Sequence, residues 1–207
     1  SLDTDQPVMI EDAVRLHKGP AYESSFDSSP KHPALWPMYR HDAARTGCSG
    51  STPPSDLKIA WTTKLPGGRI TAPTAAGGYV YVASIDAGVV HAIGVATGEA
   101  RWNYIASGRV DTPPTIIDNR ILFGCRSGWV YCLRAYDGAE IWKFHAAPRD
   151  RLVVGHGGIE SAWPVHGSVL VQDGKAYVTA GRSSFLDGGI AAYCLDVVTG
   201  EVLEERM

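Results

Sequence analysis

The stretch AIGVATGEARW at residues 92–102 recurs twice further along the chain, as CLRAYDGAEIW at 132–142 and as CLDVVTGEVLE at 194–204. Each copy begins with a small residue and carries Thr-Gly or Asp-Gly at its sixth and seventh positions, and the first two copies end in tryptophan. A Thr-Gly or Asp-Gly pair favours the positive φ of a tight hairpin turn. The repeat therefore predicts one kind of hairpin that is used three times.

The spacing of the repeat indicates the architecture. Trp61, Trp102 and Trp142 lie 41 and 40 residues apart, and TAPT at 71–74 precedes TPPT at 112–115 by 41 residues. Short runs rich in β-branched and aromatic residues, such as YVYVAS and KAYVTA, lie between the turns and read as strands. A period near 40 with four short strands per unit is typical of β-propeller blades.

One such unit cannot bury both of its faces, so neighbouring units must stack. A tryptophan at the end of the unit predicts an indole that packs against the adjacent blade, next to a small residue and a turn glycine. The positions expected to dock in this way are Ala92, Gly98, Trp102, Cys132, Gly138, Trp142, Cys194 and Gly200.

The eleven-residue unit resembles the tryptophan-docking motif of the pyrroloquinoline-quinone (PQQ)-like β-propeller repeats, the superfamily of the eight-bladed quinoprotein alcohol dehydrogenases. The resemblance covers about residues 57–207, and the stretches WPMYRHDAARTG (36–47) and 160–189 are similar to a subgroup of large exported bacterial propeller proteins. It implies a periplasmic or extracellular location, although no signal peptide is visible in this sequence. Three positions depart from the motif: its Asp is Gly94 in the first copy and Arg134 in the second, and Glu204 replaces the last Trp.

The expected fold is all-β, a partial β-propeller of about three four-stranded antiparallel blades. We place the blades at 69–105, 110–145 and 150–207, an outer strand of a preceding blade at 57–65, and an irregular segment or linker at 1–56. Three blades and a spare strand cannot close a ring. We therefore interpret the chain as a fragment of an eight-bladed propeller whose remaining blades lie in the parent chain.

Composition excludes several classes of function. The chain is 44% hydrophobic, which is enough for a core, and its net charge of −3 argues against a nucleic-acid binder. No apolar run approaches the length needed to span a bilayer. The four cysteines show neither CxxC nor zinc spacing. Cys132 and Cys194 fit small packing positions better than redox centres, and a disulfide between Cys125 and Cys132 is an open alternative.

The third unit is longer than the first two. About 15 residues are added between its fourth and first strands, within 147–167, and six or seven between its second and third strands, within GRSSFLDGG (181–189). In an up-and-down blade these two connections emerge at the same end. We therefore expect both insertions on one face of one blade, where long loops on a rigid scaffold tend to carry function.

Polar and aromatic residues gather in these insertions. The candidate ligand-binding residues are His156, Glu160, Trp163, His166, Arg182 and Asp187, joined by Arg109 and Asp111 from the preceding blade connection. Such a set can bind a polar or sugar-like ligand, a quinone or a partner protein. The favoured alternative is structural: the loops cap the blade, Trp163 covers its edge, and Arg182 pairs with Asp187.

The sequence favours a non-catalytic module, a scaffold or a platform for ligand or protein recognition within a larger exported protein. It supplies no catalytic residue and no metal site. A second hypothesis is part of a PQQ-dependent oxidoreductase; the resemblance implies that PQQ needs vicinal cysteines, a stacking Trp and clustered Glu, Asn and Asp, which the missing blades would have to supply. A third is a carbohydrate-binding surface around Trp163. The expected partners are the remaining blades and a protein or carbohydrate ligand.

Overall fold

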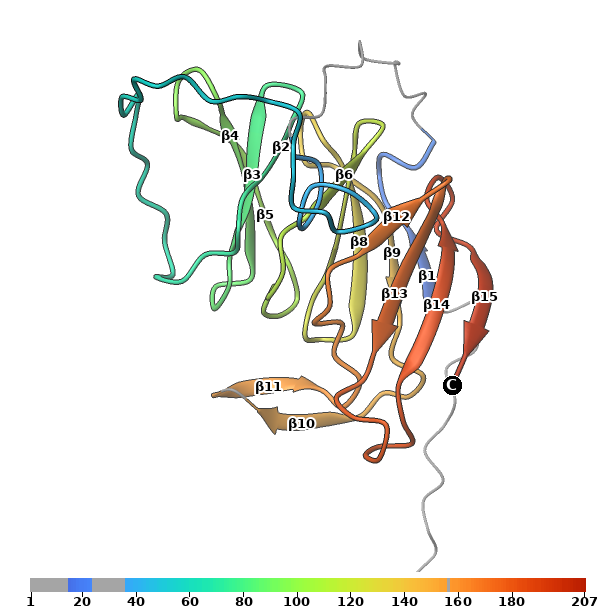
Figure 1. Ribbon diagram of the computed structural model, residues 1–207. Helices are drawn as coiled ribbons and strands as arrows, with labels where there is room; N and C mark the ends of the chain where they lie inside the picture. Colours follow the sequence, from blue (N-terminus) through green and yellow to red (C-terminus); the bar gives the residue numbers. More distant parts are fainter. Residues whose placement is uncertain (1–14, 24–35, 156) are drawn as a thin grey trace, which may run out of the picture.

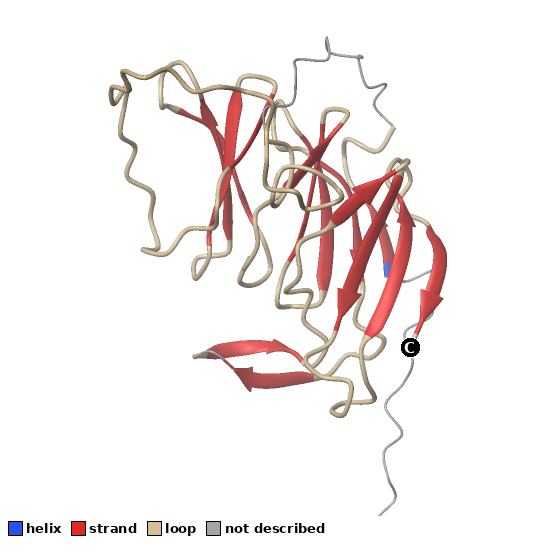
Figure 2. Cartoon of the chain, viewed as in Figure 1, coloured by secondary structure: helices blue, strands red, loops and turns tan. Residues whose placement is uncertain are grey.

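Three antiparallel sheets account for most of the regular structure in the computed structural model, which describes residues 15–23, 36–155 and 157–207 (Figures 1 and 2). Blade one consists of β2 (Thr74–Ala76), β3 (Tyr79–Ser84), β4 (Val89–Gly94) and β5 (Ala100–Ile105). Blade two consists of β6 (Thr115–Ile117), β7 (Arg120–Gly124), β8 (Trp129–Arg134) and β9 (Glu140–His145). Blade three consists of β12 (Leu170–Gln172), β13 (Lys175–Ala180), β14 (Ala191–Asp196) and β15 (Val202–Arg206). The expected all-β fold with three four-stranded blades is confirmed.

The blades stand side by side with their first strands together (Figure 1). β6 contacts both β2 and β12. Two threonines tie these inner strands: the Thr74 hydroxyl donates to the Pro114 carbonyl at 2.9 Å, and the Thr115 hydroxyl to the Val169 carbonyl at 2.6 Å. This arrangement of inner strands around a common axis is the geometry of a propeller.

Each blade carries the same irregularity at the start of its repeat. The register between the third and fourth strands shifts directly after the small residue: after Ala92, after Cys132 and after Cys194. A bulge of this kind increases the local twist and re-aims the side chains that follow. It sets the small residue opposite the final position of the repeat, which is Trp102, Trp142 and Glu204 respectively.

The indoles dock as expected. Trp61 lies on Gly98 of blade one, Trp102 on Gly138 of blade two and Trp142 on Gly200 of blade three. A Cβ at any of these glycines, all of which have φ near +70°, would lie within 2.7 Å of the indole ring. Each indole Nε1 also donates to a carbonyl of the same turn, on Val95, Ala135 and Val197, at 2.7, 2.9 and 3.1 Å.

Two apolar cores fill the seams between the blades. The seam between blades one and two contains Tyr81, Val90, Ile121 and Phe123, and the larger seam between blades two and three contains Leu122, Trp142, Phe144, Trp163, Val178 and Leu195. Each sheet therefore buries apolar side chains against its neighbour, and no blade has a core of its own.

The positions that depart from the motif have local replacements. In the third repeat, Asp196 Oδ1 accepts hydrogen bonds from the backbone N–H groups of Val198 and Thr199, as a turn-capping carboxylate does. In the second repeat Arg134 stands at that position, and it holds the turn through a bidentate ion pair with Asp137. Two different side chains thus stabilise the same turn.

Upstream residues differ from the prediction. No strand forms at 57–65, although Trp61 within it docks on blade one. Residues 15–23 fall within the segment expected to be irregular, yet β1 (Leu16–Lys18) pairs with β9 and makes blade two five-stranded. Trp36 exchanges two backbone hydrogen bonds with Ala75 of β2, at 2.8 and 3.0 Å. The sheets thus recruit parts of the N-terminal segment.

Arg15, directly before β1, fastens blade two to blade three. Its guanidinium lies 4.8 Å from the ring centroids of both Phe144 and Tyr193, donates to the His145 carbonyl at 3.0 Å and pairs with Glu205 at 3.1 Å. Cation–π contacts gain strength when the cation is shielded from water, and Arg15 is buried. This single side chain therefore crosses the seam between two sheets.

Replacing Gly138 with Ala tests the docking of the indole. The new Cβ would lie 2.7 Å from the Trp102 ring, so we expect Gly138→Ala to reduce the free energy of unfolding by about 3 kcal/mol, measured by urea denaturation. The matched control is Gly174→Ala, which has nearly the same φ (+73° against +74°) but open space around its Cβ. It bears backbone strain alone, about 1 kcal/mol. Equal losses for the two variants would contradict the docking.

The environment of His145 predicts a pH dependence. Burial lowers the pKa of His145, helped by the charge of Arg15 and opposed by that of Asp150. The unfolded chain, with a His pKa of about 6.5, then binds more protons than the native state below that pH. The free energy of unfolding should therefore fall as the pH drops from 7.5 to 5.5. Urea denaturation at both pH values should show a smaller fall for His145→Gln; an unchanged fall would contradict the assignment.

Candidate functional site

The two insertions of blade three meet at one end of the molecule, as the sequence predicts. Arg151, from the insertion before β12, pairs with Asp187, from the loop between β13 and β14, at 2.9 Å. The Gly181 N–H donates to the Pro164 carbonyl at 3.1 Å, which joins the same two segments. In Figure 1 both segments lie beyond the lower ends of the sheets.

The first insertion forms a hairpin of its own instead of extending the blade. β10 (Leu152–Gly155) pairs only with β11 (Gly158–Ser161), with Val154 opposite Ile159 and Val153 opposite Glu160. One face of the hairpin presents Leu152, Val154 and Ile159, with 62%, 85% and 75% of their surface exposed. Phe185, in the second insertion, is 93% exposed. The hairpin therefore displays an apolar surface, which we call the hairpin face (Leu152, Val154 and Ile159).

The opposite face of the hairpin carries Val153 and Glu160 and faces the protein. Glu160 is buried and pairs with Arg126 of the β7–β8 turn at 2.8 Å. Gly155 makes room for this side chain, because a Cβ there would lie 2.3 Å from Glu160 Oε1. The Ser161 N–H also donates to the Arg126 carbonyl at 2.9 Å. The hairpin is thus anchored to blade two.

Arg126 belongs to a chain of ion pairs that runs from Arg69, before blade one, to Glu160, in the insertion before blade three. Arg69 pairs with Asp86 at 2.8 Å, and Asp86 with Arg109 at 2.7 Å. Arg109 pairs with Asp111 at 3.0 Å, Asp111 pairs with Arg126, and Arg126 with Glu160. Every member lies in a connection between second and third strands or between successive blades, so all of them emerge at the same end as the insertions.

Burial increases steadily along this chain. The exposed fraction of the side chain falls from 66% at Arg69 through 20% at Arg109 to 4% at Glu160. Asp86, near the exposed end, has its pKa lowered chiefly by the hydrogen bond from Arg69. Exposed pairs contribute little to stability, whereas breaking a buried pair is strongly destabilising. We therefore expect the pair of Arg126 and Glu160 to contribute most of the stabilisation that these ion pairs provide.

The predicted ligand-binding residues fall into separate environments. Arg182 pairs with Asp187 and Arg109 with Asp111, so these charges are engaged with one another. Glu160 faces Arg126, and His166 is exposed. His156 lies outside the described residues. The structure joins Arg109, Asp111 and Glu160 into one network through Arg126, and Arg182 with Asp187 into another.

Trp163 lies within the apolar core. It is 2% exposed and belongs to the apolar cluster between blades two and three, and its Nε1 has no hydrogen-bond partner in the structure. Its ring faces are packed against protein, as the structural interpretation expects.

Several residues of this end were not singled out from the sequence. Asp86 and Arg126 occupy equivalent turns, 40 residues apart, and applying the repeat to the turns between second and third strands would have placed both beside Arg109. Leu152, Val153 and Val154 are three consecutive apolar residues, so the sequence shows no alternation that would mark Leu152 and Val154 as exposed.

Metal-binding and thiol chemistry find little support in the part of the chain that is described. No group of three or more His, Cys, Asp or Glu residues there could hold a metal ion. All four cysteines are free, and burial raises the pKa of the Cys132 thiol, so the disulfide alternative for Cys125 and Cys132 is not realised. His91 is buried between Ser84 and Asn103, at 2.9 and 2.7 Å, in a structural position. No helix within the described ranges has the length and apolarity to cross a membrane.

Comparison with known proteins agrees with this geometry. The family model described as outer membrane protein assembly factor BamB matches residues 56–126, which hold Trp61, blade one and the first half of blade two. Polyvinylalcohol dehydrogenase of Sphingopyxis sp. strain 113P3 is 26% identical over 170 residues, which is 72% of this chain and 24% of that protein. The chain therefore spans about a quarter of this curated relative.

Solved structures give the class of fold. Quinohemoprotein alcohol dehydrogenase from Comamonas testosteroni matches with a TM-score of 0.69 and 22% identity, over 92% of this chain and 29% of that one. A europium-containing methanol dehydrogenase matches with a TM-score of 0.66 and 22% identity, over 84% and 32%. At these identities the likeness shows the fold. Together with the docking repeat, it shows that the chain folds as part of a β-propeller similar to the propellers of these dehydrogenases.

Replacing Arg126 with Met tests the buried end of the ion-pair chain. The variant leaves the Glu160 carboxylate buried without this cation, and we expect it to reduce the free energy of unfolding by about 3 kcal/mol in urea denaturation. Arg69→Met is the matched control at the exposed end, with an expected loss below about 1 kcal/mol. Similar losses of unfolding free energy for Arg126→Met and Arg69→Met would show that the stabilisation from these ion pairs does not depend on their burial.

Proposed function

We propose that this chain is a non-catalytic propeller module of a larger exported protein and that it recognises a partner protein through the hairpin face. The observation that carries the proposal is the exposure of Leu152, Val154 and Ile159 on a hairpin whose other side is anchored by Glu160. Exposed apolar patches of this kind often mark contact surfaces for other proteins. The family description, an outer membrane assembly factor, supports an exported location.

The charges at the same end support recognition over catalysis. The three carboxylates and three guanidiniums of the ion-pair chain neutralise one another, and Asp187 pairs with both Arg151 and Arg182. A catalytic acid, base or nucleophile commonly has a pKa perturbed toward its task and lies in a cleft. Charges that pair with one another around a projecting apolar hairpin instead favour a rigid surface that binds a partner protein.

The second candidate is part of a PQQ-dependent oxidoreductase, favoured by the names of the matching dehydrogenases. PQQ is a polyanionic quinone and needs cationic partners. Arg109 lies between Asp86 and Asp111, and Arg126 lies between Asp111 and Glu160, so these guanidiniums already have carboxylates around them. The donor set of these three blades does not fit PQQ by itself. A sugar-binding surface on Trp163 is disfavoured because that ring is buried.

The proposal is tested with the complete protein and the double variant Val154→Asp plus Ile159→Asp. Partner proteins captured from a periplasmic extract by the unmodified protein should bind the double variant at least tenfold more weakly, because two charges would enter the apolar contact. The unfolding temperature should stay unchanged, since both side chains are exposed. Val198→Asp, at a 52% exposed position in the β14–β15 turn, is the matched control and should retain binding.

Two arms of the experiment address the alternatives. Titration with PQQ and calcium, followed by the absorption spectrum and by dye-linked alcohol oxidation, should remain flat. A glycan array should show no binding that the double variant loses. A bound-cofactor spectrum with turnover, or undiminished capture by the double variant, would overturn the recognition proposal.

A further inference from the structure

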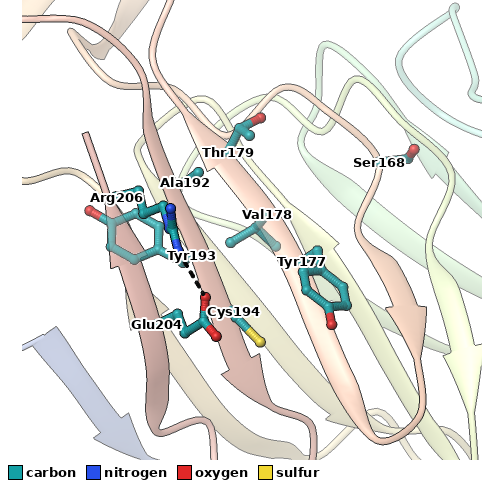
Figure 3. Close-up of a pocket in the computed structure, with 9 residues that line it drawn as sticks. All are labelled: Ser168, Tyr177, Val178, Thr179, Ala192, Tyr193, Cys194, Glu204 and Arg206. Atoms are coloured by element: carbon teal, nitrogen blue, oxygen red, sulfur yellow. Dashed lines mark ion pairs between the residues drawn. The ribbon is translucent and has the colours of Figure 1, made fainter.

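No described segment covers the outward face of blade three. The pairing register of its strands shows which residues lie on this face. Tyr177, Cys194 and Glu204 lie opposite one another on β13, β14 and β15, and Thr179, Ala192 and Arg206 form the next row. These side chains line a hollow of about 330 Å³ on the sheet (Figure 3). Its floor is mostly apolar, with Glu204 and Arg206 at one edge.

The same row is covered in the other two blades. Tyr81, Ala92 and Trp102 form it in blade one, and Leu122, Cys132 and Trp142 form it in blade two. Tyr81 is 2% exposed and Leu122 0%, whereas the equivalent Tyr177 is 42% exposed. In blades one and two, the next sheet supplies this burial. The face of blade three thus continues an interface that the molecule already uses twice.

A second copy of this chain is a poor occupant. To continue the series of blades, the second copy would pack its blade one against blade three. The docking turn of blade one receives an indole from the residues that precede this blade. That turn is already filled: Trp61 lies on Gly98 and donates to the Val95 carbonyl at 2.7 Å. The outer strand of blade three would have to displace residues 57–65 of the copy. A further sheet in which no indole already occupies this position meets no such obstacle.

The chemistry at position 204 separates this interface from the other two. Trp102 and Trp142 each donate an N–H to a turn carbonyl and cover a glycine without a Cβ. The Glu204 carboxylate is an acceptor only and would be repelled by a carbonyl oxygen at that distance. Its cationic neighbour within the described ranges, Arg206, is 3.9 Å away and 83% exposed, so that pair leaves the carboxylate largely open to another donor.

We propose that a further four-stranded sheet of the same propeller covers the face of blade three and meets Glu204 with a lysine or arginine, in place of the carbonyl-and-glycine turn that receives an indole elsewhere. The seam beyond blade three is then held by an ion pair over an apolar floor. A tryptophan at position 204 would not fit this seam, although tryptophan is the usual residue at this position of the repeat.

The test uses the complete protein that contains these residues, with the variants Glu204→Trp and Glu204→Gln. Glu204→Trp, which restores the repeat consensus, should lower the unfolding temperature by roughly 5 °C, and Glu204→Gln by roughly 2 °C. The loss for Glu204→Gln should shrink in 1 M NaCl, because salt screens an ion pair. Glu201→Gln, an exposed glutamate in the β14–β15 turn, is the matched control and should change the unfolding temperature by less than about 1 °C.

Each outcome supports or contradicts the proposed ion pair between Glu204 and a further sheet. A rise in unfolding temperature for Glu204→Trp would mean that a standard indole-accepting turn lies opposite and would overturn the proposal. Unchanged temperatures for both variants would mean that the face is uncovered. A dimer in sedimentation equilibrium that Glu204→Gln dissociates would make a second copy the occupant. If Glu204→Trp does not fold, Glu204→Gln and its salt dependence still decide between an ion pair and none.

Discussion

The structure depends on the contact between an indole and a turn that lacks a Cβ. Each docking tryptophan lies flat on the glycine of the following blade and donates its N–H to a carbonyl of the same turn. The contact needs a positive φ and an absent side chain at once, which only glycine supplies without strain. Because no sheet buries a core alone, this contact sets how far apart successive sheets stand, and the apolar seams fill the space that remains.

Two kinds of interaction occur at the end of the molecule that carries the blade connections and the two insertions. Opposite charges tie the connections of the blades to one another, and they do so more firmly toward the insertions, where water is excluded. Apolar side chains on the β10–β11 hairpin point the other way, into solvent. A rigid base and an apolar projecting face are complementary requirements for a contact surface, since binding to a preorganised surface loses less conformational entropy.

The parts of this structure that repeat were predictable, and the parts that occur once were not. The turns, the docking indoles and the common end of the two insertions follow from a 40-residue period, because each copy supports the others. β1 and Trp36 pair with strands far along the sequence and show no local strand pattern, so nothing nearby signals them. The burial of Trp163 could not be predicted for another reason: a tryptophan in a loop has the same sequence signal whether it is exposed to a ligand or, as here, buried.

The position of Arg15 has a consequence for the order in which the molecule assembles. Its partners His145 and Glu205 lie 130 and 190 residues further along the chain. During synthesis Arg15 must wait until the third blade has emerged before it can insert between Phe144 and Tyr193. Closing so long a loop is slow relative to the local hairpins. The segment around Arg15 should thus join blades two and three only after both blades have formed.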